Sequence, residues 1–238
     1  MLYSILAATE FWSAIVGAMV GGGIAYAVQI RALKESREQR AAERKQSQQA
    51  QAQSLLFKMI KIHSDHFSIF EFIENSFARA SEDGFKGEPW QFVIPIANPP
   101  EPVHFSSDEM SMLLGLQNDD VFNEIVAIDT KHNGLISALN ILNLERKQLT
   151  EKIGGGVANG LVVTSVFSEQ KVMELSPYII TVNELIHHVH SAARDHHRES
   201  EQALIKLNDI FREKLDLKHK LTFKQRQNLS TKAASEKS

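Results

Sequence analysis

Ten histidines are the residues of this chain best suited to chemistry, and eight of them fall in three stretches with the spacing of amphipathic helices. At about 100° per residue, the side chains of His63, His66, His132 and His196 lie on or beside the apolar stripes of those helices. Imidazoles that converge from three helices are the kind of ligand set that metal sites in helical bundles use. The chain has no cysteine, which excludes disulfides, zinc–thiolate sites and cysteine nucleophiles.

The carboxylates that should accompany such histidines form an incomplete set. Asp129 and Glu184 each stand three residues before a histidine, His132 and His187, which is the spacing found in di-metal bundles. Glu184 and His187, however, fall opposite the apolar stripe of their helix, so we expect both to face solvent. The sequence therefore predicts no metal ion and no cofactor, and it favours histidines that fix the register of the helices. A metal-binding bundle that uses the four stripe histidines is the alternative.

Other catalytic and binding motifs lack residues that their mechanisms need. The glycine-rich run 154–160 has no Gly-Lys-Ser/Thr ending and follows a helix instead of a strand, so it does not match a phosphate loop. No Ser, His and Asp have a spacing that identifies a triad, which is defined in space. The net charge of −3 gives no field that attracts nucleic acid. We therefore predict a non-enzymatic protein that does not bind nucleic acid.

The longest apolar run is residues 11–30, FWSAIVGAMVGGGIAYAVQI, which carries no charge between Glu10 and Arg31. A helix of this length rises about 30 Å, enough to cross the hydrocarbon core of a bilayer. Basic residues are absent from 1–10 and frequent after the run, which predicts a single-pass protein of the cell membrane, its N-terminus outside and its remainder cytoplasmic. A cleaved signal peptide is the alternative, because 25–27 (Ala-Tyr-Ala) resembles a cleavage site, but its basic n-region is missing.

Small residues recur every four positions within the 11–30 run. They form two rows on the predicted helix: Gly17, Gly21 and Ala25, and Ala14, Ala18 and Gly22. Because this spacing lets two helix backbones approach closely, it favours homo-oligomers that associate through these rows in the membrane. A membrane effector that oligomerises through this glycine-rich span is therefore a further alternative function.

Residues 31–54 are rich in Ala, Glu, Gln, Arg and Lys and contain neither Gly nor Pro, which favours a helix. Apolar residues are nearly absent, so we interpret the segment as a solvated helical stalk, either a lone helix or a coiled coil. Its basic residues are placed to contact anionic lipid headgroups next to the predicted span.

Residues 55–222 are predicted to form a helical bundle, because three long apolar stripes run along them with a period of three to four residues. The stripes cover about 55–80, 118–153 and 176–215. A short helix over 108–116 precedes the second stripe, and Ser176 with Pro177 forms a favourable N-cap and N1 pair for the third. We expect these helices to pack antiparallel and to bury their stripes against each other.

The remaining segments are irregular. The segments 91–96 (QFVIPI) and 161–167 (LVVTSVF) predict at most one minor two-stranded β ribbon. Residues 223–238 are polar and basic, which predicts a disordered tail. The predicted fold class is all-α, and the predicted function is a membrane-anchored cytoplasmic module that binds or tethers a partner protein.

Overall fold

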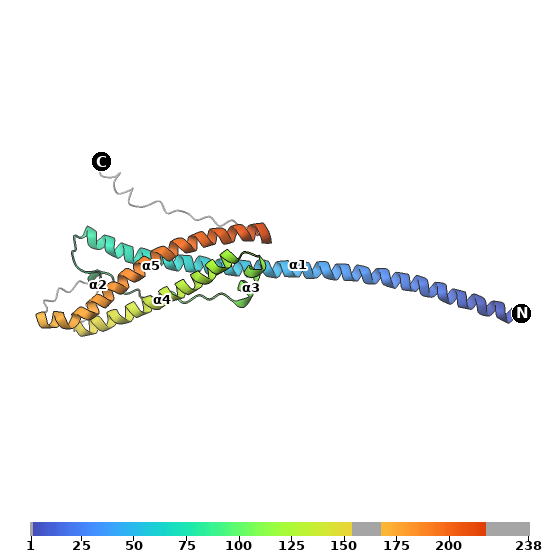
Figure 1. Cartoon of the computed structure of the whole chain (residues 1–238), viewed down its shortest axis with the longest axis horizontal. Coiled ribbons are helices and arrows are strands. Elements are labelled where there is room, and N and C mark those ends of the chain that lie inside the picture. Colours follow the sequence, from blue (N-terminus) through green and yellow to red (C-terminus); the bar gives the residue numbers. More distant parts are fainter. Residues whose placement is uncertain (1, 154–167, 218–238) are drawn as a thin grey trace, which may run out of the picture. The chain divides into compact units, whose positions relative to one another are not determined.

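The computed structural model describes the backbone of residues 2–153 and 168–217, and the side chains of residues 19, 21–153 and 168–217. These residues form helices and irregular segments, and none of them lies in a β-strand. The helices are α1 (Leu2–Glu82), α2 (Pro89–Phe92), α3 (Ser107–Gly115), α4 (Asp119–Ile153) and α5 (Glu169–Leu215) (Figure 1). The all-α prediction is confirmed.

The chain divides into two compact units, residues 1–50 and residues 51–238. The first unit consists of the N-terminal part of α1, and its residues 31–50 are helical, as the composition predicts. Ion pairs four residues apart support this polar stretch: Arg31 Nε lies 3.0 Å from Glu35 Oε1, and Lys34 Nζ lies 3.9 Å from Glu38 Oε1. Each such pair stabilises an exposed helix by about 0.3–0.5 kcal/mol.

The predicted membrane span, residues 11–30, falls partly on residues 11–18 and 20, whose side-chain surroundings the structure does not describe. Among the residues that the structure describes, no helix is long and apolar enough to cross a bilayer. The structure does describe the side chains at the end of this run, and its large apolar residues there, Tyr26 and Val28 among them, are exposed.

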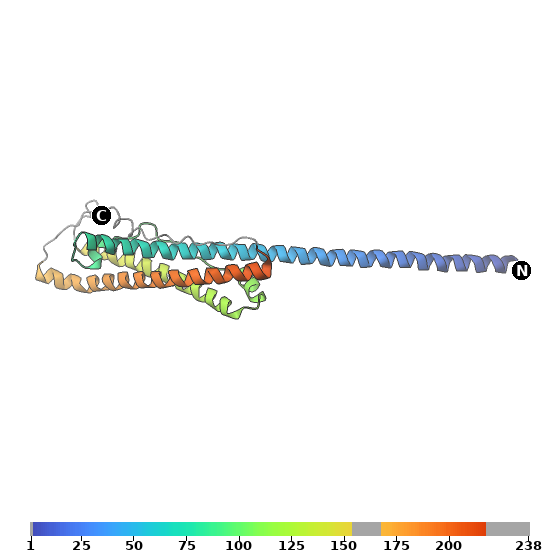
Figure 2. The ribbon, with the colours of Figure 1, turned by 90° about the horizontal axis from the view of Figure 1, so that it is seen from above.

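The second unit is a bundle of three long helices, the C-terminal part of α1 together with α4 and α5 (Figures 1 and 2). α5 runs antiparallel to both of the others. Along α1, His63 contacts Ser200 of α5 and the later residue Glu74 contacts the earlier residue His190. Along α4, Glu124 contacts Lys206 of α5 and the later residue Lys131 contacts the earlier residue Glu199. α1 and α4 are therefore parallel to each other, which corrects the predicted antiparallel packing for these two successive long helices. The reason is the long connection 83–118, which returns the chain to the opposite end before α4 begins.

The connection is held to the bundle by side-chain amides. Asn183 of α5 accepts a hydrogen bond from the Trp90 backbone N–H at 2.9 Å, and Asn133 of α4 accepts one from the Val103 N–H at 3.2 Å. The predicted strand 91–96 is absent: its first two residues end α2, which Pro89 begins, and its last carbonyl, that of Ile96, accepts from Asn143. Its predicted partner, 161–167, lies outside the described residues, as does the predicted tail 223–238.

The third long helix begins earlier than predicted. Ser168 caps α5 by accepting a hydrogen bond from the Lys171 N–H, so Pro177 lies inside the helix and not at its first position. Proline inside a helix displaces the carbonyl four residues earlier, here that of Met173, whose side chain is exposed on the solvent side. Leu175 is buried in the core, and its burial favours extending the helix past the proline. Sequence reasoning missed this start because it weighed only the local capping signal.

Candidate functional site: a buried histidine layer

The apolar core of the bundle is divided by a layer of polar residues. One apolar cluster uses 52–62 of α1, 121–128 of α4 and 203–215 of α5. The other uses 69–73 of α1, 135–149 of α4 and 175–193 of α5. The residues between the clusters form what we call the histidine layer: His63, His66, His132, His196, His197 and Ser200. All three long helices contribute to it.

His66 and His132 form the centre of this layer. His66 exposes 1% of its surface and His132 none, and His66 Nε2 lies 3.3 Å from His132 Nδ1. At this distance one nitrogen donates a proton and the other accepts it, so a single shared hydrogen bond links α1 to α4. The outer nitrogen of His132, Nε2, has no hydrogen-bond partner, and Asp65 Oδ2 lies 4.0 Å from it.

Burial keeps the imidazoles of this layer neutral. Desolvation, together with the neighbouring His132 and His196, lowers the pKa of His66 to about 3. Desolvation is also the largest cause that lowers the pKa of His132, His196, His63 and His197. Asp65 raises the pKa of His132, and Glu199 and Glu201 raise that of others, but desolvation outweighs these carboxylates, so all five histidines favour the neutral form at pH 7.

His63, His197 and Ser200 form the second part of the layer. The rings of His63 and His197 stack with centroids 4.4 Å apart. Ser200 Oγ donates to the backbone carbonyl of His197 at 2.9 Å and lies 3.2 Å from His63 Nδ1. Ser200 Oγ therefore joins His63 of α1 to the backbone of α5.

The structure brings the four stripe histidines together only in part. His66 contacts both His132 and His196, whose ring centroid lies 5.5 Å from its own, whereas His63 contacts His197. His197 and Ser200 were missed by sequence reasoning, although Ser200 stands seven residues after the buried Ala193 on the stripe of α5. Glu184 and His187 are exposed, as the helical wheel predicts.

The chemistry open to this layer is hydrogen bonding and proton uptake. Among residues 19, 21–153 and 168–217, no three His, Asp or Glu side chains are grouped so that they could hold a metal ion. His66 Nε2 and His132 Nδ1 are directed at each other. The layer therefore links three helices through neutral imidazoles.

A second buried polar group lies where α3 meets α1. Glu109 exposes 3% of its surface and accepts from Lys58 Nζ at 2.7 Å, from Ser54 Oγ at 2.6 Å and from the Ser106 backbone N–H at 2.6 Å. Burial alone would raise the pKa of Glu109, but these donors outweigh it and hold the pKa below its usual value. The network was not foreseen, because the contact between α3 and α1 joins residues far apart in the sequence.

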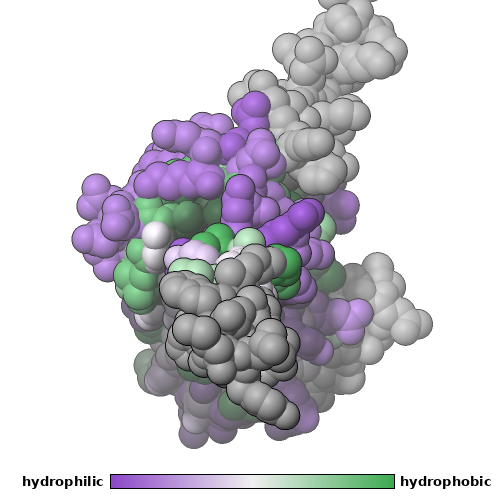
Figure 3. Space-filling view, turned by 90° about the vertical axis from the view of Figure 1, so that its right-hand side faces the viewer, coloured by the Kyte–Doolittle hydropathy of each residue, from purple (hydrophilic) through white to green (hydrophobic). Residues whose placement is uncertain are grey.

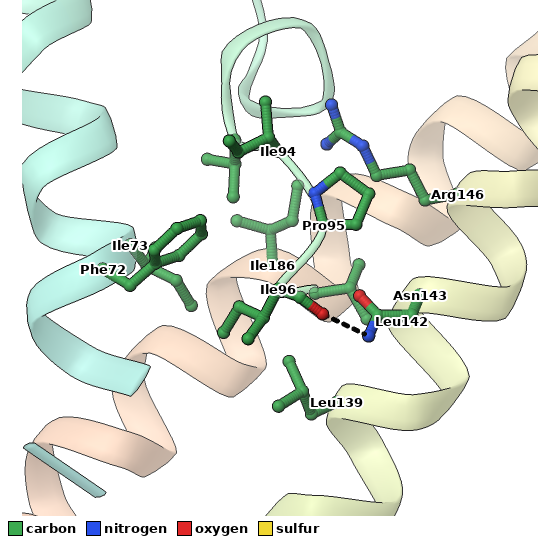
Figure 4. A pocket seen from close by; sticks show the side chains of 11 residues that line it. Phe72, Ile73, Ile94, Pro95, Ile96, Leu139, Leu142, Asn143, Arg146 and Ile186 are labelled. Carbon is green, nitrogen blue, oxygen red and sulfur yellow. Dashed lines mark hydrogen bonds between the residues drawn. The ribbon is translucent and has the colours of Figure 1, made fainter. Parts of the chain in front are cut away.

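Arg146 of α4 is a cation at the edge of an apolar cavity. The cavity, about 10 Å³ in volume, is lined by apolar side chains of α1, α4, α5 and the segment 93–96 (Figure 4). Desolvation lowers the pKa of Arg146 to about 10, and one guanidinium NH₂ nitrogen is buried without a hydrogen-bond partner. Asn143 beside it donates to the Ile96 carbonyl at 3.3 Å, while its own Oδ1 has no partner. The space is that of about one water molecule, so it does not suit a larger ligand.

The small-residue rows of the predicted span are described only in part. Gly21, Gly22 and Ala25 are exposed on α1, and a Cβ added at Gly21 or Gly22 would meet nothing within 4 Å. The surroundings of Ala14, Gly17 and Ala18 lie outside the described residues. Association through these rows stays a prediction.

The fold and the histidine layer define a three-helix bundle with a polar layer across its core. Comparison with protein-family models, with curated proteins and with solved structures finds no match to this chain.

Proposed function

We propose that this protein is a membrane-anchored helical module that binds a partner protein through the exposed face of α4. The observation that carries the proposal is the composition of this face. We define the α4 face by its exposed residues Val126, Ala127, Thr130, Gly134, Ser137, Ile141 and Leu144, which are all uncharged. Ile141 and Leu144 expose 50% and 55% of their surface although both are large and apolar.

The α4 face is bordered by few charges. The only charged residue that α4 exposes between Asn123 and Leu144 is Lys131, which lies at the margin of the face and pairs with Glu199 of α5 at 2.6 Å. On the end of the molecule that faces the viewer in Figure 3, hydrophobic residues reach the surface as patches among hydrophilic ones. An uncharged helix face that exposes large apolar side chains, here Val126, Ile141 and Leu144, is the kind of surface that docks a protein partner.

The membrane anchor in this proposal rests on the sequence. Residues 11–30 carry no charge, and the basic residues that follow them favour a cytoplasmic location for the bundle. We expect the full chain to sediment with membranes and to resist carbonate extraction. Replacing Val20 with Arg, which puts a charge near the middle of the run, should release it into the soluble fraction. Carbonate-soluble wild-type protein would contradict the anchor.

The binding proposal is tested by purifying the tagged full chain in mild detergent and identifying what accompanies it by mass spectrometry. Leu144→Lys, on the α4 face, should remove the specific partner. Met173→Lys, at an apolar position of α5 that is 76% exposed, is the matched control and should retain it. Equal recovery with both variants would refute the α4 face as the binding surface. Catalytic turnover that disappears on substitution of His66 or His132 would refute a purely binding function.

The distance between the His66 and His132 nitrogens is compatible with a second candidate function, metal binding. Two nitrogens of a tetrahedral zinc site lie about 3.3–3.4 Å apart, and His66 Nε2 and His132 Nδ1 are 3.3 Å apart. A hydrogen bond explains the same distance with the residues present, so we prefer it. Stoichiometric zinc in protein purified without chelators, lost in His132→Leu, would establish the alternative.

A further inference from the structure

The α4 face is bulky at one end and small at the other. Leu144 and Ile141 provide large side chains towards its C-terminal end, and Ser137 and Gly134 provide small ones nearer its middle. A Cβ added at Gly134 would meet nothing within 4 Å, so the backbone of α4 is open to approach there. Glycine in a helix interior costs about 1 kcal/mol relative to alanine, which a close-packed partner would offset.

These residues are placed symmetrically about Leu139. Gly134 and Leu144 each stand five residues from it, and Ser137 and Ile141 each stand two residues from it. A second α4 that lies antiparallel across the first therefore sets each Leu144 over the Gly134 of the second copy. The same alignment sets each Ile141 over the Ser137 of the second copy. The face is complementary in shape to itself.

The charges along its margins follow the same symmetry. Lys131 and Glu145 each stand seven residues from Ala138, on one margin of the face. Asp129 and Lys147 each stand nine residues from Ala138, on the other margin. When two α4 helices pack antiparallel, each margin of one face lies beside the same margin of the other. Lys131 of one copy then lies beside Glu145 of the other, and Asp129 lies beside Lys147, so opposite charges meet between the copies. The two centres, Ala138 and Leu139, differ by one residue, which is about 1.5 Å along the helix.

We propose that two copies of this chain associate through the α4 face, with the two α4 helices antiparallel and centred near residues 138–139. This inference rests on the proposed function and names its partner as a second copy of the chain. In a dimer with a two-fold axis both copies use the same surface, and each contact occurs twice. Such a surface must therefore be complementary to itself. Parallel α4 helices would instead set the bulky end of the face against the bulky end of the other copy and the small end against the small end, so the match between Leu144 and Gly134 would be lost.

The absence of cysteine from the sequence allows a cross-linking test of this register. In the full-length variant Gly134→Cys/Leu144→Cys, the two positions are about 15 Å apart along one helix, too far for a disulfide within a chain. Between antiparallel copies they face each other. We expect oxidation in mild detergent to give a covalent dimer on a non-reducing gel.

The matched control is Asn123→Cys/Thr130→Cys, two exposed positions on the same side of α4. In the proposed register every thiol pair between copies of this control is more than about 20 Å apart along the axis. Its dimer should form at least tenfold more slowly. Equal rates for the two variants, or no dimer from the first, would overturn the antiparallel register.

A charge exchange tests the margins independently. Glu145→Lys should weaken self-association about tenfold by sedimentation equilibrium of the full chain, because the introduced lysine then faces Lys131 of the other copy. Adding Lys131→Glu in the same chain should restore the dissociation constant to within about threefold. Failure of the second change to rescue the first would contradict the pairing.

The outcomes separate the two proposals. If Leu144→Lys loses a partner but the wild-type chain is monomeric and uncross-linked, the α4 face binds a different protein and only the self-pairing fails. If a tagged copy captures an untagged copy equally well with and without Leu144→Lys, both the self-pairing and its surface fail.

Discussion

The Nε2 atom of His66 lies 3.3 Å from the Nδ1 atom of His132, and both side chains are buried between the two apolar clusters of the bundle. This contact joins α1 to α4, two parallel helices that no short loop connects. A slide of α1 along α4 by one helical turn would separate the imidazoles and bury each without a partner. Such a loss costs about 1–3 kcal/mol for each unpaired group, so the pair defines one register of the two helices.

Stability should fall with acid because of His66. Its pKa is about 3 in the folded chain and near 6.5 when unfolded, so between these values the unfolded chain binds a proton that the folded chain does not. The free energy of unfolding should therefore be independent of His66 above pH 6.5 and decrease below it by up to about 1.4 kcal/mol per pH unit. Urea unfolding of the full chain in detergent at pH 7.5, 6.5 and 5.5 measures this. A His66→Leu chain with an undiminished slope would contradict the assignment.

Removing one member of the central pair should be worse than removing both. His132→Leu leaves His66 buried without its partner and should lower the free energy of unfolding by about 1–3 kcal/mol. The double variant His66→Leu/His132→Leu leaves no orphaned nitrogen and should be destabilised by less than the sum of the single changes. Urea unfolding of the four chains at pH 7.5 gives the coupling energy. A coupling near zero would mean that the hydrogen bond contributes nothing to stability.

The Glu109 network should contribute to stability at neutral pH and lose its contribution in acid. Glu109→Gln removes the charge that Lys58 and Ser54 contact, and we expect a loss of about 1–3 kcal/mol. Because the pKa of Glu109 is lowered, its contribution is present above the unfolded value near 4.5 and is lost as pH falls through the folded value. Asp108→Asn, at the exposed neighbouring position, is the control and should change stability by less than about 0.5 kcal/mol.

Arg146 should be dispensable for folding. Its guanidinium is partly desolvated beside an apolar cavity, with a buried nitrogen that has no partner, so Arg146→Met should leave stability unchanged or raise it by about 1 kcal/mol. Thermal unfolding followed by circular dichroism measures the change, with Lys147→Met at the next, exposed position as the control. A loss of more than about 1 kcal/mol from Arg146→Met alone would show that Arg146 binds an anion or contacts another part of the chain.

Periodicity was sufficient to find the long helices and the inward residues. The spacing of three and four placed Leu55, Ile125 and Val182 on buried stripes, and all three are buried. It also placed His66 and His132 inward and Glu184 outward, because a helical wheel reports the direction of a side chain relative to its own helix. A wheel does not report which side chain of another helix lies opposite, so the grouping of His63 with His197 was not predictable.

The sequence by itself determined the helical fold, the basic charge pattern after residues 11–30, and the faces that are apolar or polar, because these depend on neighbours within a turn or two. Only the tertiary structure decided that α1 and α4 are parallel, that α5 begins at Glu169, and that Glu109 is paired with Lys58. These features depend on the path of the connection 83–118 and on burial against distant segments. Local propensities are worth tenths of a kcal/mol per residue, whereas burial of an apolar side chain is worth about 1.5–3 kcal/mol, so packing prevails where the two conflict.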